Sequence, residues 1–346
     1  MTDQPLTFVS LFSGCGGMDY GFVKAGMTPL WANDVADTAM ETYRGLIPGH
    51  EAVTGDIHTI PLPDVTPDLV IGGPPCQGFS VAGKMDPDDV RSDLVYTFMD
   101  AVGTLAPRAF VMENVKSLAT NRKFTAVRRN LVQRADRMGY DTTLHILNAS
   151  HFGVPQARER MFLIGVKRGE GPPARPLPVS RYSTPTLRDA LESLPPYGEP
   201  GNDTFCNAAI TMAKNPVLRK SPWAGMMFNG AGRVICLSRP APTLPASMGG
   251  NKNPIVDQYQ LDNGGDPWIE GYHLLLRAGG SPLIEPPDRL RRITQEEAAA
   301  IQTFPAGMVW CGRQTDRFRQ IGNAVPPELA YHVALSVKSS LERKGQ

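Results

Sequence analysis

The sequence predicts an α/β protein with a doubly wound, largely parallel sheet and a smaller, irregular second domain. In the first half, short apolar runs alternate with amphipathic stretches, which is the pattern of repeated strand–helix–strand units. After Lys167 the composition changes to a proline- and glycine-rich stretch with little helical periodicity, and this continues to about Pro287. Helical patterning then returns, so we expect the chain to come back and complete the first domain.

The elements follow from these patterns in chain order. Strands are expected at 8–12, 30–32, 69–72, 109–113, 143–147 and 161–166. Helices are expected from about 18, and at 36–44, 94–105, 124–138 (a basic helix), 294–302 and 326–341. The predicted domains are residues 1–180, residues 181–287 and a return segment, 288–346, that completes the first domain.

Composition excludes several classes of protein. The chain has 346 residues and a net charge of only +1, so bulk charge neither requires nor forbids a nucleic-acid partner. Its five cysteines are odd in number and widely spaced, which argues against a disulfide framework and a zinc cluster. The first residues lack a signal-peptide pattern, and no apolar stretch approaches a membrane span. We therefore expect a cytoplasmic protein without a structural metal.

The stretch Gly72–Ser80 places a cysteine in a stiffened loop directly after an apolar strand. Two glycines and two prolines precede Cys76, and polar Gln77 and Ser80 follow it, which makes a poor segment for a buried core. In an open α/β sheet, ligands bind beyond the carboxyl ends of the strands. Cys76 is therefore a candidate nucleophile, and the alternative is a small apolar core residue.

A second glycine-rich turn, Phe12–Gly17, follows the first strand and precedes a helix. Asp34 comes about twenty residues later, a spacing that suits an acid that binds ribose hydroxyls. As a dinucleotide fingerprint the turn is imperfect, because Asp19 stands where the third glycine belongs. Asp56, after the next unit, adds a carboxylate that can face an adenine edge. Each acid alone is more often a turn or cap residue, but together they favour a nucleoside cofactor.

Six motifs resemble, in order, those of bacterial DNA cytosine-5 methyltransferases, and they span nearly the whole chain. They are Phe12–Gly17, Gly73–Cys76, Glu113–Val115, Gln156–Arg160, Arg292–Thr294 with Glu297, and Gln320–Pro327. A single motif can arise by chance, but six in the family's order point to the family. The resemblance implies a Rossmann-like S-adenosylmethionine-dependent methyltransferase sheet, with a target-recognition domain in the irregular region.

The resemblance also implies the reaction: transfer of a methyl group from S-adenosylmethionine to C5 of a cytosine that is flipped out of a specific short duplex sequence. Cytosine C5 is a poor nucleophile, but addition of the Cys76 thiolate to C6 gives an enamine-like ring. Glu113, at cytosine N3, offsets the charge that develops. Arg158 and Arg160 hold cytosine O2 and a phosphate, with a surface ion-pair ladder as the alternative.

By the same resemblance, the cofactor is contacted by the first motif and by segments after later strands. Val35 follows Asp34 where some family members place an aromatic residue that stacks on adenine. The implied cofactor-binding residues are Phe12, Gly14, Gly16, Gly17, Asp34, Asp56, Ile57, Pro74, Leu94, Asn323 and Ala324.

Duplex DNA is the implied partner. Between Lys214 and Lys252 the chain contains basic residues and no acidic residue, which indicates a local positive surface or a solvated loop. Side chains of the types that contact guanine and adenine in the major groove are Arg233, Arg239, Asn229 and Asn251. Expected phosphate contacts are Lys214, Lys220 and Lys252. Expected anchors of a small core are Trp223, Phe228 and Trp268.

Beside the nucleophile, Gln77 and Ser80 are expected to contact the flipped nucleotide's phosphate and the gap that it leaves in the duplex. For Gln77 the alternative is a loop cap. The other expected partner is a cognate restriction endonuclease that acts on the same site. We expect a monomer without membrane contact, encoded by a bacterium or a phage and associated with the nucleoid when it acts on DNA.

Three alternatives compete with this function. A tRNA cytosine-5 methyltransferase shares the catalytic and cofactor motifs, but those relatives carry a different insert with a Cys-Phe-Thr signature that this chain lacks. A catalytically silent DNA-binding protein would keep the fold, but Cys76, Glu113 and Arg160 together argue against it. A nicotinamide-dependent dehydrogenase would explain the glycine-rich turn and leave the cysteine loop unexplained.

Overall fold

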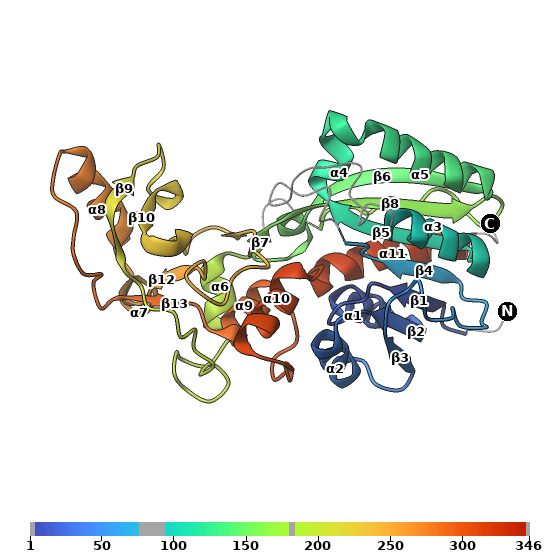
Figure 1. Cartoon of the computed structure of the whole chain (residues 1–346), viewed down its shortest axis with the longest axis horizontal. Helices are drawn as coiled ribbons and strands as arrows, with labels where there is room; N and C mark the ends of the chain where they lie inside the picture. The colour runs from blue at the N-terminus through green and yellow to red at the C-terminus, as the bar shows by residue number, and fades with distance from the viewer. Residues whose placement is uncertain (1–3, 76–93, 180–183, 344–346) are drawn as a thin grey trace. The chain divides into compact units, whose positions relative to one another are not determined.

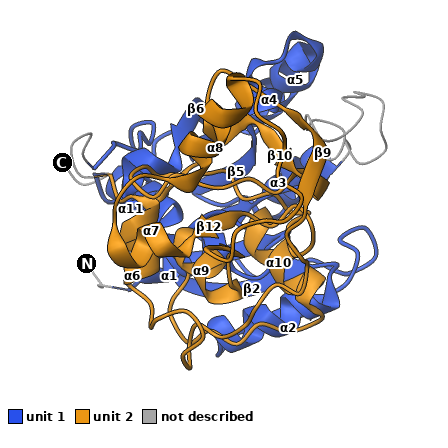
Figure 2. Cartoon of the chain, turned by 90° about the vertical axis from the view of Figure 1, so that its left-hand side faces the viewer, with its two compact units in different colours: residues 1–153, 158–182, 324–346 blue, residues 154–157, 183–323 orange. Residues whose placement is uncertain are grey.

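The computed structural model describes residues 4–75, 94–179 and 184–343. The chain forms two compact units, which Figure 2 shows in different colours. Unit 1 comprises residues 1–153, 158–182 and 324–346, and unit 2 comprises residues 154–157 and 183–323. No helix in the described part of the chain is long and apolar enough to cross a membrane.

Within the described residues, unit 1 is built on a seven-stranded sheet in the order β3-β2-β1-β4-β5-β8-β6 (Figure 1). Strands β1 to β5 pair in parallel, whereas β8 is antiparallel to both β5 and β6. The predicted α/β fold with a mostly parallel sheet is confirmed. The strands are β1 (Thr7–Leu11), β2 (Thr28–Asp34), β3 (Glu51–Thr54), β4 (Leu69–Gly72), β5 (Ala109–Val115), β6 (Tyr140–Asn148) and β8 (Glu159–Lys167).

Helices cover both faces of this sheet because alternate strand residues are apolar on both sides. Val9, Val70 and Phe110 share one face, where they pack in a core with α3 and α5. On the opposite face, the ring of Phe8 lies 5.8 Å from that of Phe22 in α1. The helices of unit 1 are α1 (Gly17–Lys24), α2 (Asp37–Leu46), α3 (Leu94–Leu105), α4 (Lys116–Thr120), α5 (Thr125–Arg137) and α11 (Pro327–Glu342), with 3-10 turns at Arg122–Phe124 and Ala149–Phe152.

Unit 2 has short elements around a small core. Met227, Phe228, Val234 and Ile255 are buried in this core, and Trp223 and Trp268 pack against it. The prediction that Trp223, Phe228 and Trp268 anchor a small core is therefore confirmed. The strands of unit 2 are β7 (Gln156–Ala157), β9 (Met212–Val217), β10 (Met226–Phe228), β11 (Ala241–Pro242), β12 (Ile255–Asp257) and β13 (Leu290–Arg292). Its helices are α6 (Leu187–Glu192), α7 (Gln258–Asn263), α8 (Trp268–Arg277), α9 (Gln295–Ile301) and α10 (Gln314–Asn323), with 3-10 turns at Pro222–Ala224 and Asn229–Ala231.

The C-terminal boundary between the units falls between Asn323 and Ala324, whereas the predicted return segment begins at residue 288. Residues 290–323 lie in unit 2 because β13 pairs with β12 and α9 packs against α6 and α10. Only α11 joins unit 1, where Gly21 of α1 leaves room for Ala330: a Cβ at Gly21 would lie 2.5 Å from the Ala330 Cβ.

Candidate functional site

The carboxyl ends of three strands meet at one edge of the sheet of unit 1. Leu11 at the end of β1 pairs with Gly72 at the end of β4, and Gly72 pairs with Met112 of β5. The strand order reverses between β1 and β4, because β2 and β3 lie on one side and β5 on the other. A crevice outside such a reversal point is where doubly wound sheets bind ligands.

Glu113 lies next to the loop that leads toward Cys76. A Cβ placed on Gly73 would lie 3.2 Å from Oε2 of Glu113, so glycine permits this close approach. The next residue, Asn114, is 1% exposed and donates a hydrogen bond from Nδ2 to the Pro74 carbonyl oxygen (3.1 Å). The acid motif and the cysteine loop are thus tied together. Cys76, Gln77 and Ser80 lie outside the described residues.

An ion pair holds the Glu113 carboxylate. Arg160 Nε lies 3.1 Å from Glu113 Oε1, and the two side chains are only 16% and 12% exposed. Arg158, the single residue that links β7 to β8 along the chain, is 1% exposed. Burial raises the pKa of Glu113, while the charges of Arg160 and then Arg158 oppose that rise. The residue between the two arginines, Glu159, forms an exposed ion pair with Lys116 (2.8 Å).

Asp34 ends β2 and fixes the glycine-rich turn that follows β1. Its Oδ2 accepts a hydrogen bond from the Gly14 N–H, and its Oδ1 accepts one from the Ala36 N–H (both 2.9 Å). Burial raises the pKa of this carboxyl, although the backbone donors lower it. Because a carboxylate has about four acceptor sites, these backbone donors leave Asp34 able to accept a further hydrogen bond.

The turn itself leaves open space beside the backbone. Phe12, Gly14 and Gly16 have positive φ angles of 56°, 56° and 88°, and Gly17 begins α1. No atom lies within 4 Å of a Cβ built on Gly14. The Phe12 side chain is partly buried against the core.

The other residues implied in cofactor binding are spread over several elements. Asp56 is exposed, and its Oδ1 accepts a hydrogen bond from the His58 N–H (3.0 Å). Ile57 packs against the core of unit 1, and Leu94 begins α3. Asn323 ends α10 in unit 2, and Ala324 begins the last segment of unit 1.

Asp19 stands where a dinucleotide fingerprint has its third glycine, and the structure gives this side chain hydrogen-bond partners. Asp19 is 1% exposed, and its Oδ1 accepts a hydrogen bond from the Tyr43 hydroxyl (2.9 Å), which also lies 3.0 Å from His50 Nε2. Burial raises the pKa of Asp19 to about 6. A Cβ at Gly16 would lie 2.9 Å from the Tyr43 ring, so this cluster lies directly under the glycine-rich turn.

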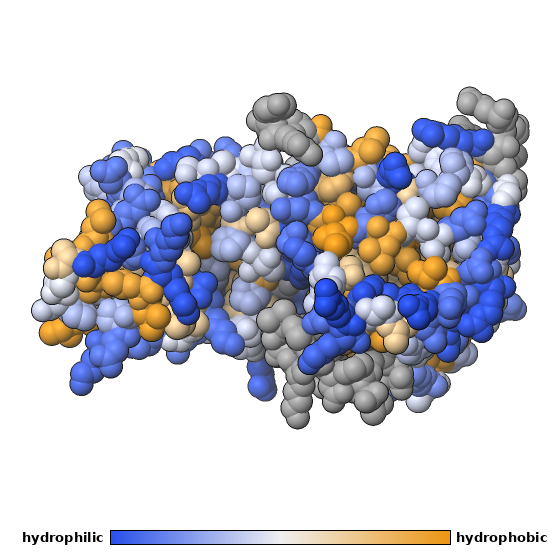
Figure 3. Space-filling view, turned by 90° about the horizontal axis from the view of Figure 1, so that it is seen from above, coloured by the Kyte–Doolittle hydropathy of each residue, from blue (hydrophilic) through white to orange (hydrophobic). Residues whose placement is uncertain are grey.

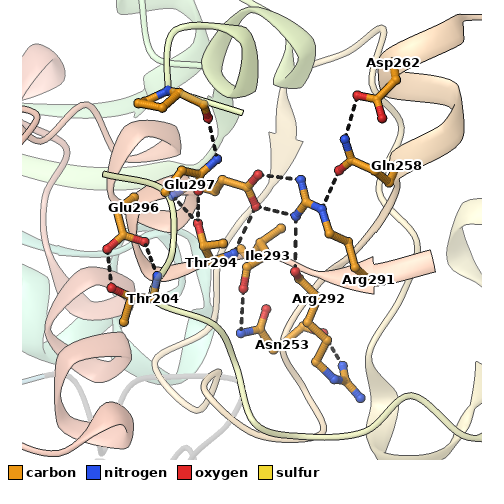
Figure 4. Close-up of polar contacts among 12 residues, drawn as sticks. Thr204, Asn253, Gln258, Asp262, Arg291, Arg292, Ile293, Thr294, Glu296 and Glu297 are labelled. Atoms are coloured by element: carbon orange, nitrogen blue, oxygen red, sulfur yellow. Dashed lines mark hydrogen bonds and ion pairs between the residues drawn. The ribbon is translucent and has the colours of Figure 1, made fainter. Parts of the chain in front are cut away.

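In unit 2, the motif Arg292–Thr294 with Glu297 is part of a buried polar network, which Figure 4 shows. Glu297 is 1% exposed and accepts two hydrogen bonds from Arg291, at 2.6 and 2.7 Å. Its carboxylate also accepts the Thr294 N–H, so Thr294 and Glu297 form a capping box that begins α9. The Arg291 guanidinium lies 4.0 Å from the centre of the Tyr197 ring. This network joins β13, α9 and α7, since Gln258 of α7 accepts from Arg291 Nε.

Arg292 fastens loops of unit 2 to β13. Its guanidinium donates hydrogen bonds to the carbonyl oxygens of Asn253 (2.6 Å), Ala208 (2.8 Å) and Ala209 (3.1 Å). The loop at 229–233 packs on the loop at 249–253 so closely that a Cβ at Gly230 would lie 2.1 Å from the Asn251 Cβ.

The predicted DNA-contacting side chains of unit 2 fall into two groups. Arg233, Asn251 and Lys252 are exposed on these two packed loops. Asn229 donates its amide to Thr211 Oγ1 (3.0 Å) and to the Met212 carbonyl oxygen (2.9 Å), so it holds β9 in place. The remaining members of the predicted set, Arg239, Lys214 and Lys220, are also exposed.

The fold and this polar edge define a class of protein. The chain matches the family model of C-5 cytosine-specific DNA methylases over residues 6–339, and it belongs to that family. It is therefore an enzyme of the DNA (cytosine-5-)-methyltransferase class, as the six motifs predicted.

Its relatives are similar over nearly the whole chain. It is 33% identical to type II methyltransferase M.NgoPII of Neisseria gonorrhoeae, over 99% of this chain and 98% of that protein. It is 32% identical to type II methyltransferase M1.HphI of Haemophilus parahaemolyticus, over 96% and 86%.

Solved structures share the fold at lower identity. A putative DNA modification methyltransferase encoded within a prophage of E. coli gives a TM-score of 0.70 at 22% identity, over 98% of this chain and 100% of that one. The Dnmt2 methyltransferase of S. pombe gives 0.67 at 18% identity, over 97% and 99%.

Proposed function

We propose that this enzyme transfers a methyl group from S-adenosylmethionine to C5 of a cytosine flipped out of a specific short duplex sequence, through a covalent Cys76–C6 adduct. One observation carries the proposal. A buried carboxyl with a raised pKa, Glu113, is held by Arg160 beside the loop that leads to Cys76, at the reversal point of the sheet.

The chain's own groups make C5 reactive. The Cys76 thiolate adds to C6, and the electron pair displaced from the C5–C6 double bond is delocalised over the ring. Glu113 in its protonated form, which the pKa rise caused by burial favours, donates its proton to N3 and neutralises that charge. Arg160 and Arg158 orient Glu113 and hold cytosine O2 and a phosphate. After methylation, loss of the C5 proton to solvent re-forms the C5–C6 double bond and expels the Cys76 thiolate from C6, and N3 returns its proton to Glu113.

The residues around the glycine-rich turn fit a nucleoside cofactor. Asp34 keeps acceptor capacity for ribose hydroxyls, Gly14 leaves open space, and Asp56 is an exposed carboxylate for the adenine amino group. Bound there, S-adenosylmethionine supplies an electrophilic methyl group. Val35 is exposed and aliphatic, so aromatic stacking on adenine is not expected from it. The proposed set also includes Phe12, Gly16, Gly17, Ile57, Pro74, Leu94, Asn323 and Ala324.

We propose that residues 1–180 and the C-terminal return segment carry catalysis and that the intervening region recognises the target. Arg233 and Asn251 are proposed to contact base edges, because both are exposed on two loops that pack on each other, one of which Arg292 holds through the Asn253 carbonyl oxygen. Lys252 supplies a phosphate contact on the same loops. Arg239, Gln77 and Ser80 complete the proposed DNA-binding set.

A biological setting follows from the relatives, which are named type II methyltransferases. We infer that methylation by this chain protects a DNA sequence from a cognate restriction endonuclease. We expect the chain to act as a monomer. Plasmid DNA from cells that express it should resist one endonuclease of a panel, and plasmid from cells with Cys76→Ser should be cut.

The direct test uses tritium-labelled S-adenosylmethionine with mixed-sequence duplex DNA or total tRNA, followed by bisulfite sequencing of the labelled nucleic acid. Label at cytosines within one DNA sequence is the expected result. Label confined to tRNA would show that the substrate is tRNA and not DNA. Cofactor binding without transfer to either nucleic acid would indicate a silent binding protein.

A further inference from the structure

A strongly basic segment of unit 1 plays no part in the proposed site. It runs from Lys116 to Arg137 and contains α4, the 3-10 turn Arg122–Phe124 and α5. Asp136 is its only acid, and Arg168 pairs with that carboxylate. The basic residues of the segment are Lys116, Arg122, Lys123, Arg128, Arg129, Arg134 and Arg137.

The fold uses some of these cations. Arg134 forms an ion pair with Asp100 (2.8 Å), and Lys116 pairs with Glu159. In contrast, Arg122, Lys123 and Arg129 are exposed, and none of the three forms an ion pair with another described residue. Their charges are therefore available to an anionic partner.

The three available cations face outward. Leu131 and Ala135 of α5 are buried in the core, and Arg129 lies two residues, or about 200°, from Leu131 around the helix. Arg122 and Lys123 lie in the 3-10 turn that precedes α5, and a rise of 1.5 Å per residue places Arg129 about 6 Å along the axis from Thr125, the first residue of α5. A DNA duplex carries one negative charge per about 1.7 Å of its length, so cations over this span can face several phosphates.

This surface lies at the same edge of the sheet as the proposed active site. α4 begins directly after Val115, at the carboxyl end of β5, which carries Glu113. Arg128 Nη1 donates hydrogen bonds to the carbonyl oxygens of Leu118 and Asn121 (both 2.8 Å), which fixes the first turns of α5 to α4. Figure 3 is seen from the side on which α4 and α5 lie in Figure 1, and it shows hydrophilic and hydrophobic residues intermixed on that side.

We propose that Arg122, Lys123 and Arg129 form a second DNA-binding surface, which contacts phosphates of the duplex outside the recognition sequence. The proposal rests on the proposed function in one respect, that duplex DNA is the substrate. These contacts carry no sequence information, and they increase the affinity for long DNA in a salt-dependent manner.

The test is the salt dependence of binding to a fluorescently labelled mixed-sequence duplex of about 40 base pairs, measured by anisotropy between about 50 and 200 mM NaCl. The variant is Arg122→Gln/Arg129→Gln. Its matched control is Arg175→Gln/Arg343→Gln, which removes two exposed arginines elsewhere in unit 1. The charge-preserving variant is Arg122→Lys/Arg129→Lys.

Each phosphate contact contributes about 0.9 to the slope of log K against log salt, so two lost contacts reduce the slope by about 1.8. Over this salt range the wild type should therefore lose about tenfold more affinity than the glutamine variant. The control and the lysine variant should keep the wild-type slope. A glutamine variant with the wild-type slope, or a lysine variant with the reduced slope, would overturn the proposal.

Methyl transfer to mixed-sequence DNA, measured on the same proteins, separates this proposal from the proposed function. The glutamine variant should keep the wild-type kcat and show a raised KM, because the three cations take no part in the chemistry. If the wild type transfers methyl groups but the glutamine variant keeps the wild-type slope, the second DNA-binding surface is contradicted and the methyltransferase function is not. A reduced slope for the glutamine variant, together with no methyl transfer by the wild type, would support the second DNA-binding surface and contradict the methyltransferase function.

Discussion

Unit 1 and unit 2 hold their functional residues by different means. In unit 1, backbone pairing of β1, β4 and β5 brings the glycine-rich turn, the cysteine loop and Glu113 to one edge. In unit 2, side chains hold the loops and elements in place. Arg292 donates hydrogen bonds to three loop carbonyl oxygens, and Arg291 joins β13 to α9 through Glu297. The strand pairing of unit 1 uses backbone N–H and C=O groups, which every non-proline residue has, whereas unit 2 depends on particular side chains.

The difference matches the proposed division between chemistry in unit 1 and recognition in unit 2. If unit 2 recognises the target as proposed, exposed residues in its loops can change while the arginine anchors remain, which would allow a new target sequence without any change at Glu113. Conversely, substitution of these arginines should destabilise unit 2, because a buried charge that has lost its partner raises the free energy of the folded state.

Cys76→Ser should lower methyl transfer by about 10⁴-fold or more, because the serine hydroxyl is a far weaker nucleophile at neutral pH. Binding of S-adenosylmethionine, measured by isothermal titration calorimetry, should survive. Cys236→Ser in unit 2 is the matched control and should retain full activity. Undiminished turnover of Cys76→Ser would eliminate the covalent mechanism.

Arg291→Ala should destabilise unit 2 by about 3–5 kcal/mol, because Glu297 would remain as a buried, unpaired charge. Urea unfolding followed by tryptophan fluorescence reports mainly this unit, since Trp223, Trp268 and Trp310 lie in it and the fourth tryptophan, Trp31, lies in unit 1. Arg291→Met/Glu297→Met removes both charges and should recover part of the loss. If Arg291→Ala abolished cofactor binding as well, the independence of the two units would be refuted.

Glu113→Gln should slow methyl transfer by about 10²–10³-fold with little effect on DNA affinity, because the amide cannot supply a proton at N3. Burial raises the pKa of Glu113, so the protonated form persists to higher pH than in an exposed glutamate. The wild-type rate should fall as pH rises through this raised pKa, and the variant should lose that dependence. Glu159→Gln, an exposed neighbour on β8, is the control; equal losses of rate and DNA affinity in Glu113→Gln would indicate a structural role.

Asp19→Asn should stabilise unit 1 at neutral pH by up to about 3 kcal/mol, at about 1.4 kcal/mol per pKa unit. The pKa of Asp19 is about 6 in the fold against 3.8 in the unfolded chain, so the folded state binds the proton more tightly. The stability that the carboxyl contributes is complete below pH 3.8 and is lost as pH rises through 6. The gain of the variant over the wild type, measured by urea unfolding at pH 4 and pH 7, should appear only at pH 7, and an equal gain at both would contradict the assignment.

Much of unit 1 could be predicted from sequence because its signals are local. Alternating apolar runs identified β4 and α3 with their observed bounds, and the return of α11 followed from its amphipathic pattern. The antiparallel pairing of β8 could not be predicted, because a strand's direction in a sheet depends on connections that its own residues do not specify. Helix α8 in unit 2 was missed, because its consecutive leucines at 274–276 obscure the helical period.

The sequence alone determined the family, the chemistry-bearing residue types and their order, because each motif is a short run whose meaning lies in adjacent residues. Only the tertiary structure decided which of them meet. Glu113 and Arg160 are far apart in the chain and become an ion pair through the register of β5 and β8. Asp19 acquires a raised pKa because folding buries it beneath the turn, and Asn229 becomes a support for β9 because its amide is within reach of Met212. Distances between remote residues and the loss of water around a charge are properties of the packed molecule, so no local pattern encodes them.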